Sequence, residues 1–181
     1  NFKRFLRKEE IVWVIVKDKL LKLVTTVVVA ATTKKFVAKE HYVLDTSDDA
    51  PVKFGWFNDN FKSWFLTGED KIEDPINEQT IGGYKLLKNS LAAPIIAELG
   101  GETNVETTLT ELHSLLKKQG KGKKDEKGDL LTNGFSNIFY IKDYSGVLRA
   151  VYVYWFGGCW YVGACSASNT RGWGGGRRVF S

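Results

Sequence analysis

The chain has 181 residues, of which 43% are hydrophobic and 26% charged, and its formal net charge is +5. This length and composition fit one globular domain with its own core, and they exclude a disordered chain. There is no apolar run of about 18 residues, so we expect no transmembrane segment. The sequence contains no methionine. We therefore expect that its natural start, with any signal peptide, lies outside it.

The basic charge raises the question of a nucleic-acid partner, but its distribution argues against one. Lysines cluster mainly in Lys117–Lys127, where glycines interrupt them and Asp125 and Glu126 offset them. A phosphate-binding patch would need aromatic side chains among the lysines, and this segment has none. We interpret the segment as a solvated loop, and we expect no specific nucleic-acid partner.

The first quarter of the sequence is typical of β-structure. Glu10–Val16 and Leu20–Ala31 are apolar and β-branched, and the lysines between them predict the turn of a hairpin. A short helix over Lys19–Val24 is the alternative. Phe36–Leu44 is a further predicted strand, and Thr46–Pro51 has the Asp and Pro residues typical of a turn.

Helices are expected in the middle of the chain. After an extended Val52–Trp56, Asn58 or Asp59 would cap a helix that ends at Leu66 and carries aromatic residues on one face. Tyr84–Leu99 is also rich in apolar residues, and its Pro94 marks the start or a break of a helix.

Thr107–Gln119 has the strongest helical pattern of the chain. Its leucines form one stripe, and Thr107 or Thr108 can act as N-cap with Glu111 close behind, as in a capping box. His113 lies beside the stripe, and we interpret it as a residue at the edge of the core.

From Leu130 onward the pattern changes to alternating strands with a hairpin turn at Asp143–Gly146. In the last strand the alternation directs Trp160, Val162 and Ala164 to the core. It directs Tyr161, Gly163 and Cys165 outward. The predicted strands are Leu130–Leu131, Gly134–Lys142, Val147–Trp155 and Trp160–Cys165.

Residues 151–181 differ in composition from the rest of the chain. They hold three tryptophans in a background of Gly, Ser, Tyr, Cys and Arg, and contain no Lys, Asp, Glu, Gln, His or Met. An ordinary surface strand would carry Lys and Glu, so folding alone does not account for this bias. The residues fit the frame W-x-G-x-x-W-x-V-x-A-x-S, a short loop, and then x-W-x-x-G-x-R-V-F-S.

This frame resembles the variable region of proteins from diversity-generating retroelements, in which adenines of a template repeat are copied as any base. Asparagine codons of the template can change to many residues, but never to Trp, Lys, Glu, Gln or Met. Trp155, Trp160 and Trp173 are therefore assigned to the scaffold. The resemblance, and the residues that such mutated codons can encode, identify eleven positions as variable and ligand-binding. They are Tyr154, Phe156, Gly158, Cys159, Tyr161, Gly163, Cys165, Arg171, Gly172, Gly174 and Arg177.

The resemblance implies an α+β fold of the C-type lectin type, with two helices and small antiparallel sheets. One sheet would join the two ends of the chain, and the other would display the binding face. This domain would cover residues 36–181, with the variable region at 151–181, and residues 1–35 would form an N-terminal β-hairpin extension or belong to the same domain.

The implied function is ligand binding without catalysis, cofactor or metal. The C-terminal surface would be rewritten by mutagenesis and would recognise a variable target, either a protein or a cell-surface molecule. Tyr154, Phe156 and Tyr161 are the expected anchors, because tyrosine-rich surfaces offer rigid amphipathic contact area. Arg171 and Arg177 would supply charge.

Two alternatives remain open from the sequence. The first is an enzyme of the formylglycine-generating type, which has a related fold and a similar Gly-rich, Arg-Val ending. Its chemistry needs a copper-binding cysteine pair, but Cys159 and Cys165 are both at variable positions. On one extended strand they would lie about 20 Å apart, which also excludes a disulfide. The second is a basic nucleic-acid-binding domain, whose affinity would fall steeply with salt.

Overall fold

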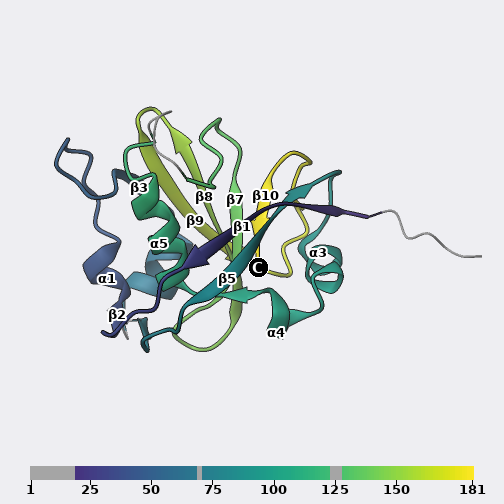
Figure 1. Cartoon of the computed structure of the whole chain (residues 1–181), viewed down its shortest axis with the longest axis horizontal. Coiled ribbons are helices and arrows are strands. Elements are labelled where there is room, and N and C mark those ends of the chain that lie inside the picture. Colours follow the sequence, from purple (N-terminus) through teal and green to yellow (C-terminus); the bar gives the residue numbers. More distant parts are fainter. Residues whose placement is uncertain (1–18, 69–70, 123–127) are drawn as a thin grey trace, which may run out of the picture.

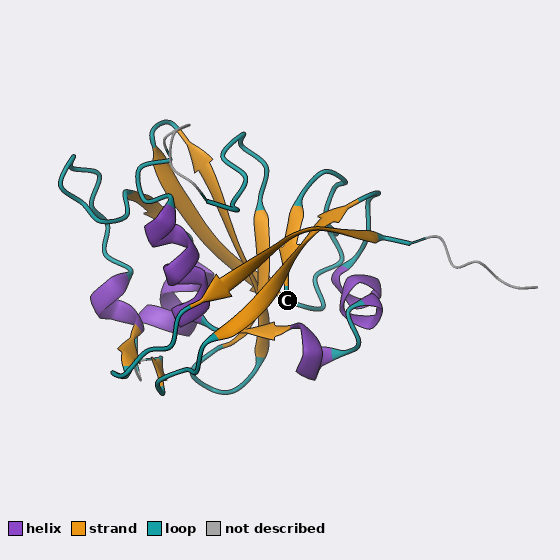
Figure 2. Cartoon of the chain, in the orientation of Figure 1, coloured by secondary structure: helices purple, strands orange, loops and turns teal. Residues whose placement is uncertain are grey.

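A computed structural model of the chain describes residues 19–68, 71–122 and 128–181. A large twisted sheet runs through the molecule, and short helices lie on both sides of it (Figures 1 and 2). The protein therefore has the mixed α+β structure that the sequence predicts. No helix within the described ranges has both the length and the apolar character needed to span a bilayer.

The large sheet contains eight strands. They are β1 (Leu21–Val29), β3 (Phe54–Phe57), β5 (Gln79–Leu86), β6 (Glu106–Thr107), β7 (Asn137–Lys142), β8 (Leu148–Phe156), β9 (Cys159–Ser166) and β10 (Arg178–Phe180). Their order is β1-β5-β10-β7-β8-β9-β3, with β6 beside β7. The final strand, β10, lies in the middle of the sheet, antiparallel to β5 and parallel to β7 (Figure 1).

The remaining elements are short. A second, two-stranded sheet pairs β2 (Phe36–Val37) with β4 (Ile72–Glu73). The helices are α1 (Ala38–His41), α2 (Asp59–Phe61), which continues as a π-helical turn over Lys62–Leu66, α3 (Ala92–Glu98), α4 (Glu102–Val105) and α5 (Leu109–Lys118).

Two hydrophobic clusters cover opposite faces of the large sheet. The larger one packs α5, α1, α2 and the π-helical turn against residues such as Val151, Trp160 and Phe180. The smaller one packs α3 and α4 against Ile138 and Ala150. The central strands β7 and β8 therefore bury alternate residues on the two sides. Helices α3 and α4 cover only part of their face, and Phe156 at the end of the β8–β9 hairpin stays exposed.

The structure confirms the predicted N-termini of α2 and α5 and the predicted hairpin turn. Thr108 and Glu111 form a reciprocal capping box at the start of α5. The side chain of Asn58 accepts a hydrogen bond from the backbone N–H of Phe61 and caps α2. Asp143 accepts the N–H of Gly146 in the turn between β7 and β8, where the positive φ of 83° suits glycine.

The prediction of one strand over Phe36–Leu44 is wrong for most of its length. Pairing with β4 ends at Val37, and one turn of helix follows. This turn places Tyr42 beneath α5, where its hydroxyl donates to the carbonyl oxygen of Leu109 at 3.2 Å. A contact between segments that are distant in the chain therefore overrides the local strand preference.

Three other local predictions also need correction. Tyr84–Leu99 is helical only over α3, because its first residues belong to β5, whose Gly82 and Gly83 weaken the strand pattern. Leu130–Leu131 is irregular, since the Gln119 side chain, rather than a neighbouring strand, accepts the N–H of Leu130. The alternative of a helix over Lys19–Val24 is wrong, since Leu21–Val24 lies within β1. The predicted strand Glu10–Val16 lies outside the described residues.

The expected small sheet for the binding face is also not observed. Strands β8 and β9 belong to the large sheet, which mixes antiparallel pairs with the parallel pairs β3–β9, β7–β10 and β6–β7. The small β2–β4 sheet contains no residue of the variable region. Residues 21–29, for which the sequence leaves open an N-terminal extension or a place in the same domain, form the edge strand beside β5 and contribute Val27 and Val29 to the larger core cluster.

Candidate binding face

The β8–β9 hairpin carries most of the positions that the sequence marks as variable. Its turn consists of Gly157 and Gly158, with φ values of 58° and 88°. Two positive φ angles are what a two-residue hairpin turn of type I′ requires. The register then pairs Trp155 with Trp160 and Tyr154 with Tyr161, so equivalent residues of the two strands share a face.

The inner face of this hairpin contains Trp155 and Trp160. Trp160 is fully buried, and its indole N–H donates to the carbonyl oxygen of Gln119 at 2.8 Å. Val162 and Ala164 are buried beside it. Trp155 is half-buried, with its ring edge-to-face against Trp160 at 5.4 Å between centroids. These side chains anchor the hairpin to the larger core cluster.

The outer face carries an aromatic cluster of Trp56, Tyr154, Phe156 and Tyr161. Tyr161 stacks on Tyr154 at 5.3 Å between centroids and lies 6.0 Å from both Phe156 and Trp56. Phe156 is 63% exposed and Trp56 is 42% exposed, while the two tyrosines are half-buried. The sequence pattern favours core packing for Trp56, but this residue is exposed on the outer face because β3 pairs with β9.

Two predicted surface positions on the same side of the hairpin are buried instead. Cys159 is 8% exposed, because its sulfur lies directly against Gly55 of β3, where a side chain at position 55 would collide with it. Gly163 is covered by the ring of Tyr152 on the neighbouring strand. Both residues face outward from the core as predicted, but neighbouring residues cover them.

The cysteines do not form a paired site. Cys159 and Cys165 are both free and stand near opposite ends of β9. Within the described ranges, no three His, Cys, Asp or Glu side chains are grouped so that they could hold a metal ion.

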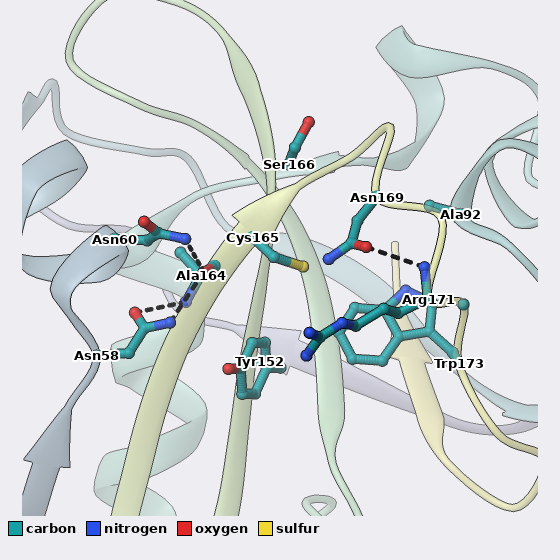
Figure 3. Close-up of a pocket in the computed structure, with 11 residues that line it drawn as sticks. Asn58, Asn60, Ala92, Tyr152, Ala164, Cys165, Ser166, Asn169, Arg171 and Trp173 are labelled. Atoms are coloured by element: carbon teal, nitrogen blue, oxygen red, sulfur yellow. Dashed lines mark hydrogen bonds between the residues drawn. The ribbon is translucent and has the colours of Figure 1, made fainter.

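A pocket of about 340 Å³ opens beside the C-terminal end of β9 (Figure 3). Tyr152 and Cys165 line it from the sheet, and Asn58 and Asn60 line it from α2 and its cap. The loop after β9 closes the other side. This loop contributes Asn169, Arg171, Gly172 and Trp173.

Two anchors hold the pocket walls in place. Asn58 and Asn60 donate their amide N–H groups to the carbonyl oxygen of Ala164, at 3.0 and 3.2 Å, and join α2 to β9. Trp173 exchanges two backbone hydrogen bonds with Ser90, and its ring stands edge-to-face on Tyr152 at 5.6 Å. Trp173 is therefore half-buried on the outer face of the sheet, and it does not belong to the inner core with Trp160.

The remaining variable positions spread along the C-terminal loop. Gly172 and Gly174 share a second hollow with Arg171, beside Asn89. Arg177 is half-buried and lines a separate hollow with Phe135. The fold therefore brings Tyr154, Phe156 and Tyr161 together, and Cys165, Arg171 and Gly172 together. Arg177 lies against Gly174 and does not line the pocket beside β9.

Burial keeps the pocket neutral except at Arg171. It raises the pKa of the Cys165 thiol, an effect partly offset by a hydrogen bond with Asn169. Burial is also the main cause that raises the pKa of the Tyr152 hydroxyl. Both groups therefore stay protonated at neutral pH, and neither adds negative charge beside the guanidinium.

Comparison with known proteins gives no matching family model, no similar curated protein and no similar solved structure. The class that the fold and the site define is an α+β protein with an outward aromatic and polar face on a sheet hairpin.

Proposed function

We propose that this chain is a ligand-binding protein whose outer face is diversified by a retroelement. One observation carries the proposal. The positions within the strands that template adenines could rewrite, 154, 156, 159, 161, 163 and 165, all lie on one face of the β8–β9 hairpin. Trp155 and Trp160, which mutation of adenines in an asparagine codon cannot produce, lie on the other face.

This separation is what diversification needs. A side chain can change freely only where the position of the backbone does not depend on it, because buried cores are close-packed and respond to each added or lost atom. Trp160 and its neighbours hold the hairpin from below, so the exposed residues above, such as Phe156, can vary. Cys159 and Gly163 are the exceptions, since Gly55 and the ring of Tyr152 limit the side chains that fit there. Contact with a target also needs contiguous side chains, and the aromatic cluster supplies them.

The proposed target is a protein or a cell-surface molecule. Tyrosine and phenylalanine at positions 154, 156 and 161 offer large, rigid contact area, as the side chains of antibody binding sites do. Trp56 lies outside the variable region and adds an aromatic contact that would be the same in every copy. We include a fold of the C-type lectin type in this proposal. In that fold one sheet joins the two ends of the chain, and β1 and β10 lie in the same sheet here.

The genomic DNA beside the gene tests the proposal. We expect a near-copy of the codons for residues 151–181, adjacent to a reverse transcriptase gene. This repeat should encode asparagine, or another adenine-rich codon, at 156, 158, 159, 161, 163, 165, 172, 174 and 177. It should encode tryptophan at 155, 160 and 173. Differences at bases other than adenine throughout the region, or the absence of a repeat, would refute diversification.

A further inference from the structure

The pocket beside β9 combines hydrogen-bond donors with a single positive charge. Its walls hold the side-chain amides of Asn58, Asn60 and Asn169 and the hydroxyl of Tyr152, and one N–H of each of the first two amides is already donated to the carbonyl oxygen of Ala164. Within the described part of the chain, no carboxylate lines it, and Arg171 is its one cation. A guanidinium without a carboxylate among these described residues favours an anionic group over a cation.

Arg171 is placed to meet a group inside the pocket. Its backbone N–H donates to the side-chain oxygen of Asn169 at 2.9 Å, which fixes the start of the side chain at the pocket rim. The guanidinium then extends across the pocket toward Tyr152, with Asn58 and Asn60 on the opposite wall (Figure 3). Arg171 itself is exposed, and within the described part of the chain no ion pair to it is found.

We propose that this pocket binds a single carboxylate group of the partner, held by the guanidinium of Arg171. The planar fork of a guanidinium matches a carboxylate with two parallel hydrogen bonds. One positive charge is balanced by a monoanion, whereas a phosphate dianion would keep an unpaired charge in a pocket without a second cation. The volume, about 340 Å³, is at the lower end for ligand pockets and fits one side chain or a chain end.

The pocket has constant walls and a variable rim. Asn58, Asn60 and Tyr152 lie outside the predicted variable positions, and Trp173 cannot be reached from an asparagine codon. Arg171, Cys165 and Gly172 are the variable positions. The inference thus rests on the proposed function in one respect. The carboxylate preference would belong to this sequence variant, whereas the polar side chains of the walls would be present in other variants as well.

Titration with sodium acetate, followed by NMR of the side-chain N–H groups of Arg171 and Trp173, tests the proposal on the folded chain. We expect both signals to shift and to saturate in the millimolar range, at an ionic strength held constant with sodium chloride. Arg171→Ser should weaken binding about tenfold or more, because the charged donor is lost. Arg177→Ser, the matched control at another variable arginine, should bind acetate as the parent does.

Two peptides then separate the sources of the carboxylate. One is amidated and contains a single glutamate, and the other has no acidic side chain but a free C-terminus. The peptide that competes with acetate identifies the source. Shifts that do not saturate, equal shifts in Arg171→Ser, or tighter binding of inorganic phosphate than of acetate would overturn the proposal. These results do not depend on the template repeat, so this inference and the proposed function can fail separately.

Discussion

Trp160 has the largest fully buried side chain among the described residues, and its position explains why the outer face can vary. Its ring fills the core beneath the hairpin, and its indole N–H is satisfied by the carbonyl of Gln119. Phe156 stands on the opposite face and is mostly solvent-exposed. Tyr161 lies between these extremes, since three aromatic rings surround it.

Substitutions at these three residues should therefore form a graded series. Trp160→Ala should lower the free energy of unfolding by about 3–5 kcal/mol, because a large cavity remains. Phe156→Ser should change it by less than about 0.5 kcal/mol, as for other exposed positions. Tyr161→Ser should cost about 0.5–1.5 kcal/mol, since aromatic contacts are lost. Urea unfolding measures all three, and equal losses at Trp160 and Phe156 would contradict the separation of scaffold from surface.

At the scale of the element, the turn of the β8–β9 hairpin limits what diversification can do. Gly157 and Gly158 both have positive φ. Residues with a Cβ atom adopt this conformation at a cost, although asparagine tolerates it better than most. Gly158 is at a predicted variable position, so the turn would favour glycine and asparagine there, and the template itself would encode asparagine.

Gly158→Val should lower the free energy of unfolding by about 1–2 kcal/mol relative to the parent, because a β-branched residue is strained at this φ. Gly158→Asn is the matched control and should cost clearly less. Thermal or urea unfolding of the two variants checks this. If valine and asparagine were equally tolerated, the hairpin would not be constrained by its turn.

At the scale of the whole molecule, a cluster of aromatic rings joins β2 and α1 to α5. Phe36 of β2 stacks on His41 of α1 at 4.3 Å, and His113 of α5 lies 4.9 Å from His41. The pKa of His113 is lowered to about 3, mainly by burial and in part by the nearby His41 and Lys117. The folded protein therefore keeps His113 neutral at pH values where an unfolded chain would protonate it.

The stability of the protein should fall as the pH falls from 7 toward 5. An unfolded histidine has a pKa near 6.5, so below this value the unfolded state binds a proton that the folded state excludes until about pH 3. We expect a loss of about 1 kcal/mol between pH 7 and pH 5.5. His113→Phe should remove most of this dependence, as measured by urea unfolding at each pH. An unchanged slope in that variant would assign the effect to other groups.

Several features could be predicted from the sequence because they depend on neighbours in the chain. The capping box of Thr108 and Glu111 is local, since its two residues are three positions apart. The alternation of β9 is local too, because successive side chains of any strand point to opposite faces. Trp160, Val162 and Ala164 were therefore assigned to the core without knowledge of the fold.

Other features were decided only when distant segments packed together. Trp56 joined the aromatic cluster through the pairing of β3 with β9, and Gly55 in the same strand allowed Cys159 to be buried. At the start of α5, the carboxylate of Glu73 accepts the backbone N–H groups of Leu109 and Thr110, which no local pattern indicates.

The pocket beside β9 has the same origin. Arg171 alone is one charge on a loop. It shares a pocket with Asn58 and Asn60 because these two side chains fasten α2 to Ala164. The sequence by itself determined which residues of the hairpin face inward and outward, because that choice follows from the geometry of a single strand. Tertiary structure decided which outward positions are open and what surrounds them, because exposure depends on side chains that arrive from elsewhere in the chain.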